Sequence, residues 1–593
     1  MIHAKDHKTA YIPGFDPWDF LGPKRRRLLD QSWAGLYREH ILDSLPINKL
    51  VPYFDADLGR PTKELYTALS VVLLQQMFDL TDEETVFELA FNQSWHFAMD
   101  IPGEADDAKY LCPKTLWNLR DIVTEHKLDG ALFDGLTAKL AQVFDVDARL
   151  QRLDSVHVKS NMRRLGRLGL IARTINKFLV NLKRQQPELL AGLDAELVER
   201  YLSEKALGCF SLVKPSEAQP KLALAAADLA RLVERFRDCE AAAGMSSFAL
   251  LLRVFNEQCA VKEAANGDAP TVELKPAKEV ASNSLQNPSD PDATYSGHKG
   301  QGYSVQVLET YTAAESEPEG AATLNLIVDV EVTPACVGDA GAVLPVLAAT
   351  RERGLTPEQV LADTAYGSDE NCVAAAELGV EVVSPVMAKA SAKISLVDFT
   401  ITASGEVTAC PAGAAPTDGK IRGKEHKFGF DAAVCGACPR RAECPVKPGK
   451  KRCFLRFTDK DLRLARRRAA ERDPEFRDKY RWRSGVEATM SELARKTGLK
   501  RLRVRGADAV RVCAKLKATG VNILRAARVR AARLLNPRGP AAPAPVGPNF
   551  LAGATLDYAF FLVKPCRQSS WARRALIFVA QFVGQPIFLR PAV

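Results

Sequence analysis

The spacing of apolar residues changes character in the amino-terminal part of the chain. From about residue 29 to residue 128, apolar side chains recur at helical intervals, as in Leu65, Leu69 and Leu73. Near residue 146 the period becomes two, which is typical of a half-buried strand. The alternating positions are Val146, Ala148, Leu150, Asp154, Val156 and Val158. The pattern predicts an all-α domain over residues 1–140, followed by the first strand of a second domain.

Helical spacing returns between residues 161 and 259, so we expect a helical insertion over about residues 161–290. Two strand candidates follow at residues 303–308 and 324–332, separated by a loop rich in Glu, Ala and Gly. This order predicts a hairpin with a long connection.

The next stretch alternates helical and strand patterns, as in an α/β domain. The predicted elements are a helix at 340–353, a strand at 359–363, a helix at 369–378 and a strand at 380–386. A second insertion over about 389–473 contains clustered Cys residues, and a strong helix begins near Pro474 and runs beyond Arg495. We therefore expect a mixed sheet with flanking helices in a domain over 141–530. Residues 531–593, with their run of Pro, Ala and Gly, predict a linker and a short tail.

Composition sets the scale of the fold. With 593 residues, 47% hydrophobic and 26% charged, the chain is long enough for two or three domains and is not a disordered polymer. The first residues lack the basic and apolar regions of a signal peptide, so we expect a cytoplasmic protein. The 13 Cys residues then indicate reduced thiols or metal ligands. The membrane-like run at 575–589 is shorter than the ~20 residues of a spanning helix, which favours a packed segment and no membrane partner.

The net charge of +9 is too small to indicate an anionic partner by itself, but its distribution is uneven. Residues 440–468 contain twelve Lys or Arg, and residues 495–511 contain seven more. Such a density suits a phosphate backbone. A solvated surface of ordinary basic helices is the alternative.

Two carboxylates stand out among the 72 acidic residues because of their local context. Asp154 lies on the apolar parity of its predicted strand, where an unpaired carboxylate is costly unless a cation or hydrogen bonds compensate. Asp363 follows an apolar run at the carboxyl end of another predicted strand. That edge is where ligands bind in open α/β sheets.

A third carboxylate, Glu487, belongs to the predicted helix after Pro474. Tyr480, Arg483 and Glu487 stand at i, i+3 and i+7, so they share one stripe of a continuous helix and can face one site together. The adjoining apolar stripe consists of Val486, Met490 and Leu493. The alternative interpretation is a surface Glu paired with Arg483 four residues earlier, and for this residue taken alone that alternative is favoured.

Two other polar residues receive no catalytic role. His157 stands three residues after Asp154, so the alternation of a strand directs it to the opposite face. Asp339 lies in a polar loop that opens a helix, where an N-cap is a better prediction than a fourth metal ligand.

Several motifs together resemble bacterial insertion-sequence transposases of the DDE type, which have an RNase H-like core. The segments LDSVHVKSN, VLADTAYGSDEN and YRWRSGVEATMSELARKTGLKRLRVRG are similar to the three acidic motifs of that family, in the same order. GHKGQGYSVQV and VEVTPACVGDAGA resemble its second and third strands, and GRPTKELYTALSVVLLQQMFDLTDEE resembles its helical amino-terminal domain. The resemblance covers most of residues 30–525.

The last helix of the family carries a Tyr-x-x-Arg-x-x-x-Glu-x6-Lys signature. Tyr480, Arg483 and Glu487 match it residue by residue, whereas the position of the final Lys is Ala494, with Arg495 and Lys496 just beyond. The departure weakens the transfer of a DNA contact to either basic residue and leaves the acidic residues unaffected.

The resemblance implies an α/β RNase H-like core, interrupted by a helical and a Cys-rich insertion and preceded by a helical DNA-binding domain. It implies that Asp154, Asp363 and Glu487 bind two Mg²⁺ or Mn²⁺ ions and catalyse cleavage and strand transfer at the terminal inverted repeats of the element. Tyr480 and Arg483 would contact the nearby phosphate or terminal base. The candidates for DNA-backbone contacts are Lys159, Lys500, Arg501, Arg503 and Arg505.

The same resemblance implies double-stranded DNA as partner, a homodimer in the synaptic complex and a location at the bacterial nucleoid. Two alternatives remain open. One is an RNase H-like nuclease that hydrolyses DNA without strand transfer. The other is a DNA-binding regulator whose active site has decayed.

A cluster of five Cys residues within the second insertion includes the motif CGAC. Its members are Cys410, Cys435, Cys438, Cys444 and Cys453. Thiolates with Pro and Gly loops between them are able to hold a structural Zn²⁺, and related transposases often carry a similar insertion. Only one CxxC pair is present, so reduced thiols are at least as good an interpretation.

Overall fold

The computed structural model describes residues 2–5, 16–59, 61–203, 213–262, 271–313, 322–387 and 393–535. All of them belong to one unit of the chain, Met1–Pro540. The linker expected from residue 531 begins too early, because residues 531–535 are still helical. Residues 536–593, including the apolar run at 575–589, lie outside the described residues. None of the helices in the described ranges has the length and apolar character that a bilayer span needs.

The amino-terminal region is helical, as its apolar spacing predicts, and its described residues form no strand before residue 150. Its α-helices are α1 (Gly22–Asp30), α2 (Trp33–Leu36), α3 (Leu65–Phe78), α4 (Asp82–Phe91), α5 (Gln93–Ala98), α6 (Asp106–Lys109), α7 (Pro113–Glu125) and α8 (Leu128–Phe144). A π-helix, η2 (Tyr37–Ile41), and the 3-10 turns η1 (Asp19–Leu21), η3 (Leu42–Ser44), η4 (Ile47–Lys49) and η5 (Val51–Tyr53) complete it. A capping box between Thr81 and Glu84 begins α4.

A mixed sheet of six strands forms the centre of the molecule. The strands are β1 (Leu150–Lys159), β4 (Thr294–Ser296), β5 (Gly300–Thr310), β6 (Ile327–Pro334), β7 (Gln359–Ala362) and β8 (Glu381–Val383). β5 pairs antiparallel with β1 on one side and with β4 and β6 on the other. β7 is parallel to β1, and β8 is parallel to β7. The predicted β5–β6 hairpin and the parallel strands are confirmed.

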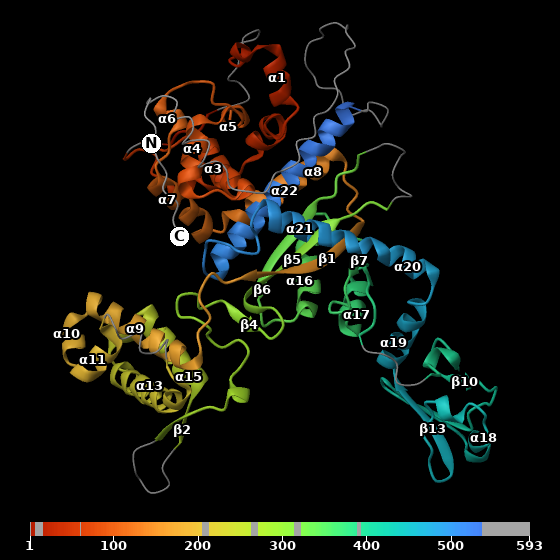
Figure 1. The fold of residues 1–593 in the computed structure, drawn as a ribbon. Helices are drawn as coiled ribbons and strands as arrows, with labels where there is room; N and C mark the ends of the chain where they lie inside the picture. The colour runs from red at the N-terminus through yellow and green to blue at the C-terminus, as the bar shows by residue number, and fades with distance from the viewer. Residues whose placement is uncertain are drawn as a thin grey trace, which may run out of the picture. The chain divides into compact units, whose positions relative to one another are not determined.

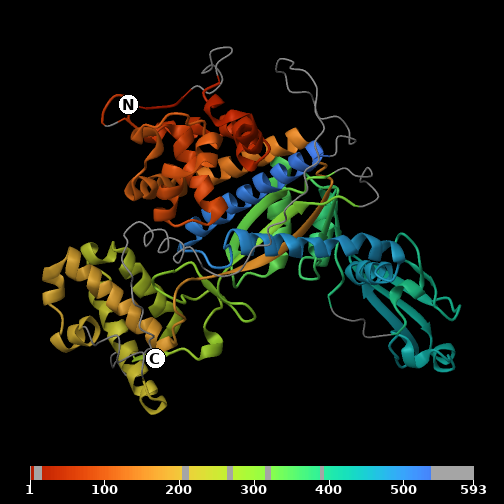
Figure 2. The same ribbon diagram turned by 45° about the horizontal axis from the view of Figure 1, so that its top comes forward.

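Helices cover both faces of this sheet, in agreement with the expected α/β arrangement. On one face, Val156 and Val158 of β1 share a core with Phe133 of α8 and with the last two helices, α21 (Gly485–Lys496) and α22 (Ala507–Leu535). α22 runs beside α8 and across the sheet (Figures 1 and 2). The other face contacts α16 (Val343–Glu352), which follows the short turn η8 (Asp339–Ala342), and α17 (Asp369–Glu377) lies beside β8.

The segment between β1 and β4 has its own core. Its helices are α9 (Arg167–Gln185), α10 (Pro187–Ala191), α11 (Ala195–Leu202), α13 (Pro215–Phe236), α14 (Glu240–Ala243) and α15 (Ser246–Gln258), with the turn η6 (Ala277–Glu279) after them. Phe178, Tyr201 and Leu251 are among its buried residues. A hairpin of β2 (Cys259–Lys262) and β3 (Thr271–Leu274) also forms here, although the helical spacing did not predict it.

The Cys-rich segment likewise contains a core of its own, built around Phe428, Phe430 and Leu455. Its strands are β9 (Thr400–Ile401), β10 (Val407–Ala409), β11 (Asp418–Arg422), β12 (Glu425–Asp431) and β13 (Arg452–Thr458). Its helices and turns are η9 (Leu396–Asp398), α18 (Ala432–Gly436), η10 (Arg441–Glu443) and α19 (Asp459–Ala470).

The single helix expected from Pro474 past Arg495 is wrong in one respect. The chain forms α20 (Pro474–Tyr480), then the 3-10 turn η11 (Arg481–Ser484), and then α21. Tyr480, Arg483 and Glu487 therefore belong to three successive elements. The tighter 3-10 winding changes their angular relation from that of an ideal α-helical stripe.

Candidate active site

The pairing of β1 with β7 brings the first two predicted carboxylates together. The two strands are parallel, and their last paired residues are Leu153 and Ala362. Asp154 and Asp363 each come one residue later, so they are neighbours across the strand pair at the carboxyl end of β7. This is the sheet edge where the sequence places a ligand site.

Asp154 is a half-buried carboxylate whose side chain is 16% exposed. Burial raises the pKa of Asp154, and the negative charges of Asp363 and Asp339 raise it further. The backbone N–H of Ser155 donates to Asp154 Oδ1 at 2.8 Å and, with the positive charge of Arg483, opposes that rise. Arg483 Nη2 donates to Asp154 Oδ2 at 2.8 Å. Asp154 therefore receives the compensation that its apolar parity requires, from a side chain 329 residues away.

Asp363 is held by the backbone around it. Its Oδ1 accepts from the N–H of Ala365 at 2.8 Å, and its carbonyl accepts from Ser384 Oγ at 2.6 Å. These bonds fix the turn that leaves β7. Asp363 forms no ion pair with any Lys or Arg in the described parts of the chain, so Asp154 alone of the two carboxylates is paired with a cation.

Glu487 lies at the start of α21 and is largely exposed, with 69% of its side chain accessible. Arg483 Nη1 donates to Glu487 Oε1 at 3.4 Å, which is the i, i+4 surface pair that the sequence offered as the alternative interpretation. Arg483 therefore lies between two predicted catalytic carboxylates and binds both. The structure brings Asp154 and Asp363 together, and it connects Glu487 to them only through this guanidinium.

Tyr480 packs against the small core of Tyr311, Leu361 and Val383 beside the same edge. Burial raises the pKa of the Tyr480 phenol; the positive charge of Arg483 opposes the rise, and the negative charges of Asp363 and Asp154 add to it. Tyr480 is therefore close enough to Arg483 and the two Asp residues for their charges to influence its pKa, despite the break in the helix.

A buried arginine that the sequence did not single out fixes the position of the Arg483 turn. Arg152 stands two residues before Asp154 on β1, and its Nη1 donates to the carbonyl of Trp482 at 2.9 Å. Its Nε donates to Glu309 Oε1 at 2.6 Å. Arg152 thus connects strand β1, which carries Asp154, to the turn η11, which carries Arg483.

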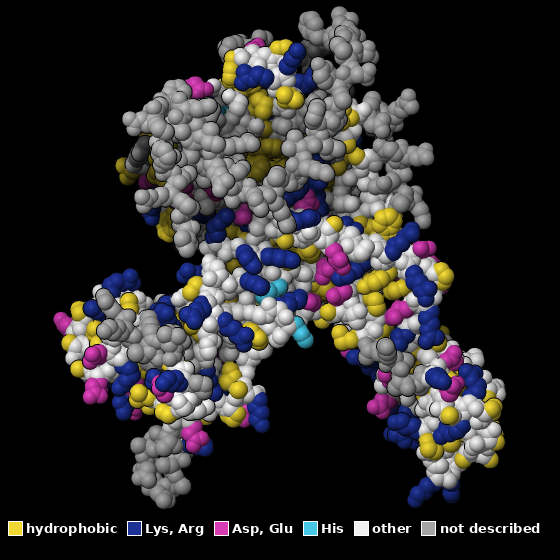
Figure 3. All heavy atoms as spheres, in the orientation of Figure 1, with side chains coloured by type: hydrophobic (Ala, Val, Ile, Leu, Met, Phe, Trp, Pro, Cys, Tyr) yellow, Lys and Arg dark blue, Asp and Glu magenta, His cyan; other side chains and the backbone are white. Residues whose placement is uncertain are grey.

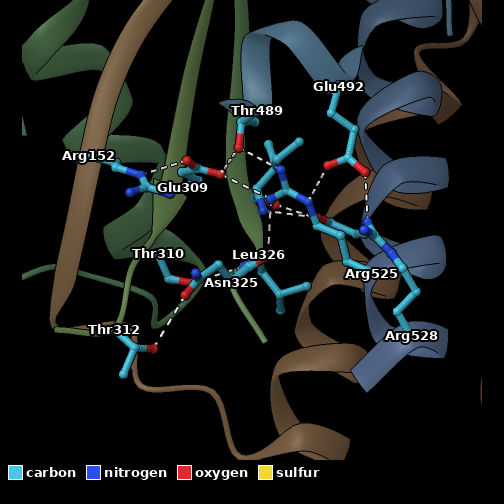
Figure 4. A network of polar contacts seen from close by, with 12 residues as sticks. Arg152, Glu309, Thr310, Thr312, Asn325, Leu326, Thr489, Glu492, Arg525 and Arg528 are labelled. Carbon is cyan, nitrogen blue, oxygen red and sulfur yellow. Dashed lines mark hydrogen bonds and ion pairs between the residues drawn. The ribbon is translucent and has the colours of Figure 1, made fainter. Parts of the chain in front are cut away.

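Glu309 extends this connection into a buried polar network (Figure 4). The Glu309 side chain is fully buried, and its Oε2 accepts from Thr489 Oγ1 at 2.5 Å and from Arg525 Nη1 at 3.0 Å. Glu492 Oε2 accepts from Arg525 Nε at 2.8 Å. Strands β1 and β5 are thereby joined to helices α21 and α22. Pairs so far apart along the chain give no periodic signal, so the spacing of residues does not predict them.

The N-cap predicted for Asp339 is wrong. Gly338 occupies the N-cap position of η8, and no side chain caps the turn. Asp339 instead accepts from Gln306 Nε2 at 3.0 Å and lies 3.7 Å from Lys299 Nζ. Gln306 Oε1 in turn accepts from the buried hydroxyl of Tyr366 at 2.5 Å. A long-range partner on β5 has replaced the local capping bond, and Asp339 lies close enough to Asp154 to influence its pKa.

The predicted DNA-backbone residues gather where β1 ends. Lys159, Lys500, Arg501, Arg503 and Arg505 are all exposed. The N–H of Lys159 donates to the carbonyl of Lys500 at 3.1 Å, which places β1 beside the turn between α21 and α22. Arg503 is paired with Asp79 at 3.2 Å, and Arg505 Nε donates to Asn161 Oδ1 at 3.3 Å.

Several basic residues of the denser run at 440–468 form ion pairs and hydrogen bonds with other parts of the chain. Arg463 pairs with Asp369 at 2.6 Å, and Arg467 donates to the carbonyls of Gly367 and Ser384. Lys460 pairs with Glu370 at 2.6 Å. These contacts join α19 to α17, so the density of positive charge in this run does not by itself indicate a DNA surface.

The Cys cluster shares one small core but forms no set of metal ligands. Cys410, Cys435, Cys438 and Cys444 line a cavity of about 270 Å³, and Cys453 is buried on β13. Burial, with the neighbouring thiol of Cys453, raises the pKa of Cys435 to about 11. Zn²⁺ binding and reduced thiols therefore both stay predictions for this cluster.

Two of the three predicted Mg²⁺ ligands fit a shared divalent cation. Asp154 and Asp363 are neighbouring carboxylates, which are the oxygen ligands that Mg²⁺ and Mn²⁺ take. Arg483 supplies the positive charge beside Asp154. Within the residues that the structure describes, no group of three or more His, Cys, Asp or Glu side chains is arranged to hold a metal ion. The pair fits the ion, and Glu487 does not complete the set in this arrangement.

Comparison with known families adds an independent finding. Residues 409–527 match the family model described as a transposase DDE domain. The match contains Tyr480, Arg483 and Glu487, and it leaves Asp154 and Asp363 outside. It confirms the resemblance to DDE transposases and indicates transposase activity. No curated protein matches the chain.

Proposed function

We propose that the chain is a DNA transposase that cleaves and rejoins DNA at the terminal inverted repeats of its own mobile element. The observation that carries the proposal is the adjacency of Asp154 and Asp363 at the sheet edge. Arg483, which lies in the region that matches the transposase family model, donates a hydrogen bond to Asp154. The mixed sheet, in which β1 is antiparallel to β5 and parallel to β7, supports an RNase H-like core.

In this proposal Asp154 and Asp363 hold the Mg²⁺ or Mn²⁺ ions, and Glu487 is the third ligand. When bound, such ions supply activation of the attacking water or 3′-hydroxyl and stabilisation of the leaving 3′-oxygen. Arg483 pairs with Asp154 at 2.8 Å and with Glu487 at 3.4 Å. A guanidinium is well suited to phosphate oxygens, so we propose that Arg483 transfers from these carboxylates to the phosphate of the DNA end.

The remaining partners follow from the same proposal. Tyr480 lies beside Asp363 and Arg483 and would contact the terminal base or its phosphate. Lys159, Lys500 and Arg501 are exposed cations without an ion pair in the described ranges, and they would contact the DNA backbone together with Arg503 and Arg505. Synapsis of two DNA ends would bring two copies of the chain together.

The test is an in vitro assay with a mini-element, target DNA and Mg²⁺. We expect Asp154→Asn, Asp363→Asn and Glu487→Gln each to lower the rate of end cleavage by on the order of 100-fold or more, because each removes a ligand of a cation that contributes several kcal/mol to transition-state stabilisation. Glu475→Gln is the matched control for Glu487→Gln, because Glu475 is also an exposed carboxylate in an i, i+4 ion pair, with Lys479 at 3.0 Å. We expect this control to cut at the wild-type rate.

The products separate the alternatives. Joined molecules support transposition, whereas free ends without joined molecules support an RNase H-like nuclease. DNA binding without cleavage by the wild-type protein supports the decayed regulator. If all three carboxylate variants cut and join at the wild-type rate, the assignment of the site is wrong.

A further inference from the structure

A pocket of about 390 Å³ lies beside α9, away from the carboxylate pair. It is formed by one face of α9, by the residues that lead into that helix, and by the loop at 287–289. Its polar lining residues are Arg163, Arg173, Asn176, Lys177, Asn181, Asn287 and Ser289.

The lining is positively charged and contains no carboxylate. Arg163 and Arg173 are exposed, and Lys177 is half-buried. None of the three forms an ion pair with a carboxylate in the part of the chain that the structure describes. Burial lowers the pKa of Lys177, and the nearby positive charge of Arg505 lowers it further. Cations placed together without counter-charges create a local positive potential that favours an anion.

The donors in the pocket are held in place by hydrogen bonds. Lys177 Nζ donates to the carbonyl of Pro288, and Asn287 Nδ2 donates to the carbonyl of Arg163 at 3.0 Å. These bonds fix the loop against α9. Asn176 Nδ2 donates to the carbonyl of Tyr201 at 2.7 Å, whereas Asn181 adds an amide group to the lining. Asn, Arg and Lys are among the side chains that proteins use on phosphate oxygens.

Contacts within the same compact unit connect this pocket to the end of β1. Asp290 follows the pocket loop and is almost fully buried. It accepts from Ser160 Oγ at 2.5 Å, from the hydroxyl of Tyr303 at 2.5 Å and from the N–H of Gly506 at 3.0 Å. The pocket is therefore tied to the turn that carries Lys500, Arg501 and Arg505. Lys and Arg side chains are spread over the helical segment and the neighbouring sheet domain on the face that Figure 3 shows.

We propose that the pocket beside α9 binds backbone phosphates of duplex DNA that extends beyond the end being cut. The proposal rests on the proposed transposase function and adds a second contact region to it, on the helical segment. The exposed positions of Arg163 and Arg173 make the pocket accessible to a continuous backbone. Each phosphate so neutralised releases condensed counterions, which makes the contribution measurable by its salt dependence.

The experiment compares the full-length protein with Arg173→Gln/Lys177→Gln for binding to a terminal inverted repeat duplex with flanking DNA, at several salt concentrations. We expect the slope of log affinity against log salt to fall by about 2, and the affinity at about 0.15 M salt to fall by about 10-fold or more. The matched control is Lys183→Gln/Arg237→Gln, which removes the same charge from exposed positions of the same segment outside the pocket. We expect the control to retain the wild-type slope.

Equal slopes for the pocket variant, the control and the wild type would overturn the proposal. Saturable binding of inorganic phosphate at Lys177, without any change in the DNA slope, would also overturn it in favour of a site for a free anion. Arg173→Gln alone, expected to lower the slope by about 1, provides the answer if the double variant does not fold.

The two proposals fail in different ways. A wild-type protein that does not cut DNA, combined with a reduced slope for the pocket variant, contradicts the transposase and leaves the pocket as a DNA site. A wild-type protein that cuts and joins, combined with an unchanged slope, contradicts the pocket alone. Asp154→Asn serves as the internal reference, because it is expected to abolish cutting and to retain the wild-type salt slope.

Discussion

Gly485 is the point at which the turn that carries Arg483 meets strand β1. A Cβ atom at this position would lie 1.9 Å from Arg152 Nη1, well inside any tolerable contact. The missing side chain allows the guanidinium of Arg152 to reach both Glu309 and the carbonyl of Trp482. The site thus depends on a residue that contributes no functional group.

We expect Gly485→Ala to destabilise the protein by roughly 1–3 kcal/mol, because Arg152 must move or the helix must shift. Cleavage activity should fall as well, since the turn positions Arg483. Gly135→Ala is the matched control, because Gly135 lies on the exposed side of α8 with nothing within 4 Å of a Cβ. It should be neutral or stabilising by about 0.5–1 kcal/mol. Urea denaturation measures both; equal free energies of unfolding for the two variants would contradict the packing argument.

At the level of single residues, the sequence predicts those positions that depend on the local pattern of a strand or helix. Strand parity predicts Asp154 and a strand end predicts Asp363, and the strand pairing places the two side by side. The N-cap predicted for Asp339 failed because a distant amide, Gln306, competes for the same carboxylate. The sequence does not predict the role of Arg152, because its burial depends on two distant partners, Glu309 and the carbonyl of Trp482.

Among the elements, α21 and α22 are fastened to the sheet by charge as well as by apolar contact. Glu309 on β5 accepts from Arg152, Thr489 and Arg525, and Glu492 on α21 pairs with Arg525 of α22 at 2.8 Å. A buried carboxylate with complete hydrogen bonding gives a unique geometry, whereas removing one partner leaves an uncompensated charge. The network therefore fixes the helix that carries Glu487.

Glu492 gives this network a pH dependence. Burial opposes its ionisation, but the charge of Arg525 and the bonds from Lys496 and Arg525 outweigh burial and lower the pKa of Glu492 from 4.5 to about 2. Because the folded pKa lies below the unfolded one, the stabilisation is complete above about pH 4.5 and is lost as the pH falls toward 2.

We expect Glu492→Gln to lower the free energy of unfolding at pH 7 by about 2–3 kcal/mol, and the difference from wild type to shrink as the pH falls from 4.5 toward 2. Thermal denaturation at several pH values measures the difference. A loss that stays constant between pH 7 and pH 3 would show that Glu492 acts by packing alone.

The helix break at η11 marks the limit of periodicity as a predictor of elements. No Pro interrupts the segment, and Val486, Met490 and Leu493 continue the apolar stripe as predicted. The 3-10 winding coincides with the hydrogen bond from Arg152 to Trp482 and with the close approach at Gly485. A tertiary contact has overridden local propensity, and such a contact is not encoded in the spacing of apolar residues.

At the scale of the whole molecule, the two ends of the helical segment between β1 and β4 lie next to each other. Ser160 and Asp290, 130 residues apart, are joined by a hydrogen bond of 2.5 Å. The segment has its own buried core. The sequence indicated an insertion here from the return of helical spacing, and the common point of entry and exit is the geometry that an insertion requires.

We expect the rest of the chain to fold when residues 163–286 are replaced by a short Gly/Ser linker, because Ser160 and Asp290 already bridge the gap. The melting temperature of the sheet domain should stay within about 4 °C of wild type, which corresponds to about 1 kcal/mol. Asp290→Ala in the full-length chain is the contrasting variant: it breaks the junction and should lower the melting temperature more. Circular dichroism measures both, and an unfolded shortened chain would contradict the separation of the two cores.

The junction at Asp290 also bears on the order in which the chain acquires its structure. Strands β1 and β5 pair although 143 residues separate Lys159 from its partner Gly302, which is the pair nearest to this junction. Closing so long a loop from an unfolded chain costs entropy, and contacts between distant segments slow folding. If the helical segment collapses first, its two ends arrive together and the β1–β5 pairing becomes nearly local. We therefore expect the helical segment between β1 and β4 to fold early, although it lies outside the carboxylate site. Its folding would bring β1 and β5 together and so allow the sheet that carries Asp154 and Asp363 to form.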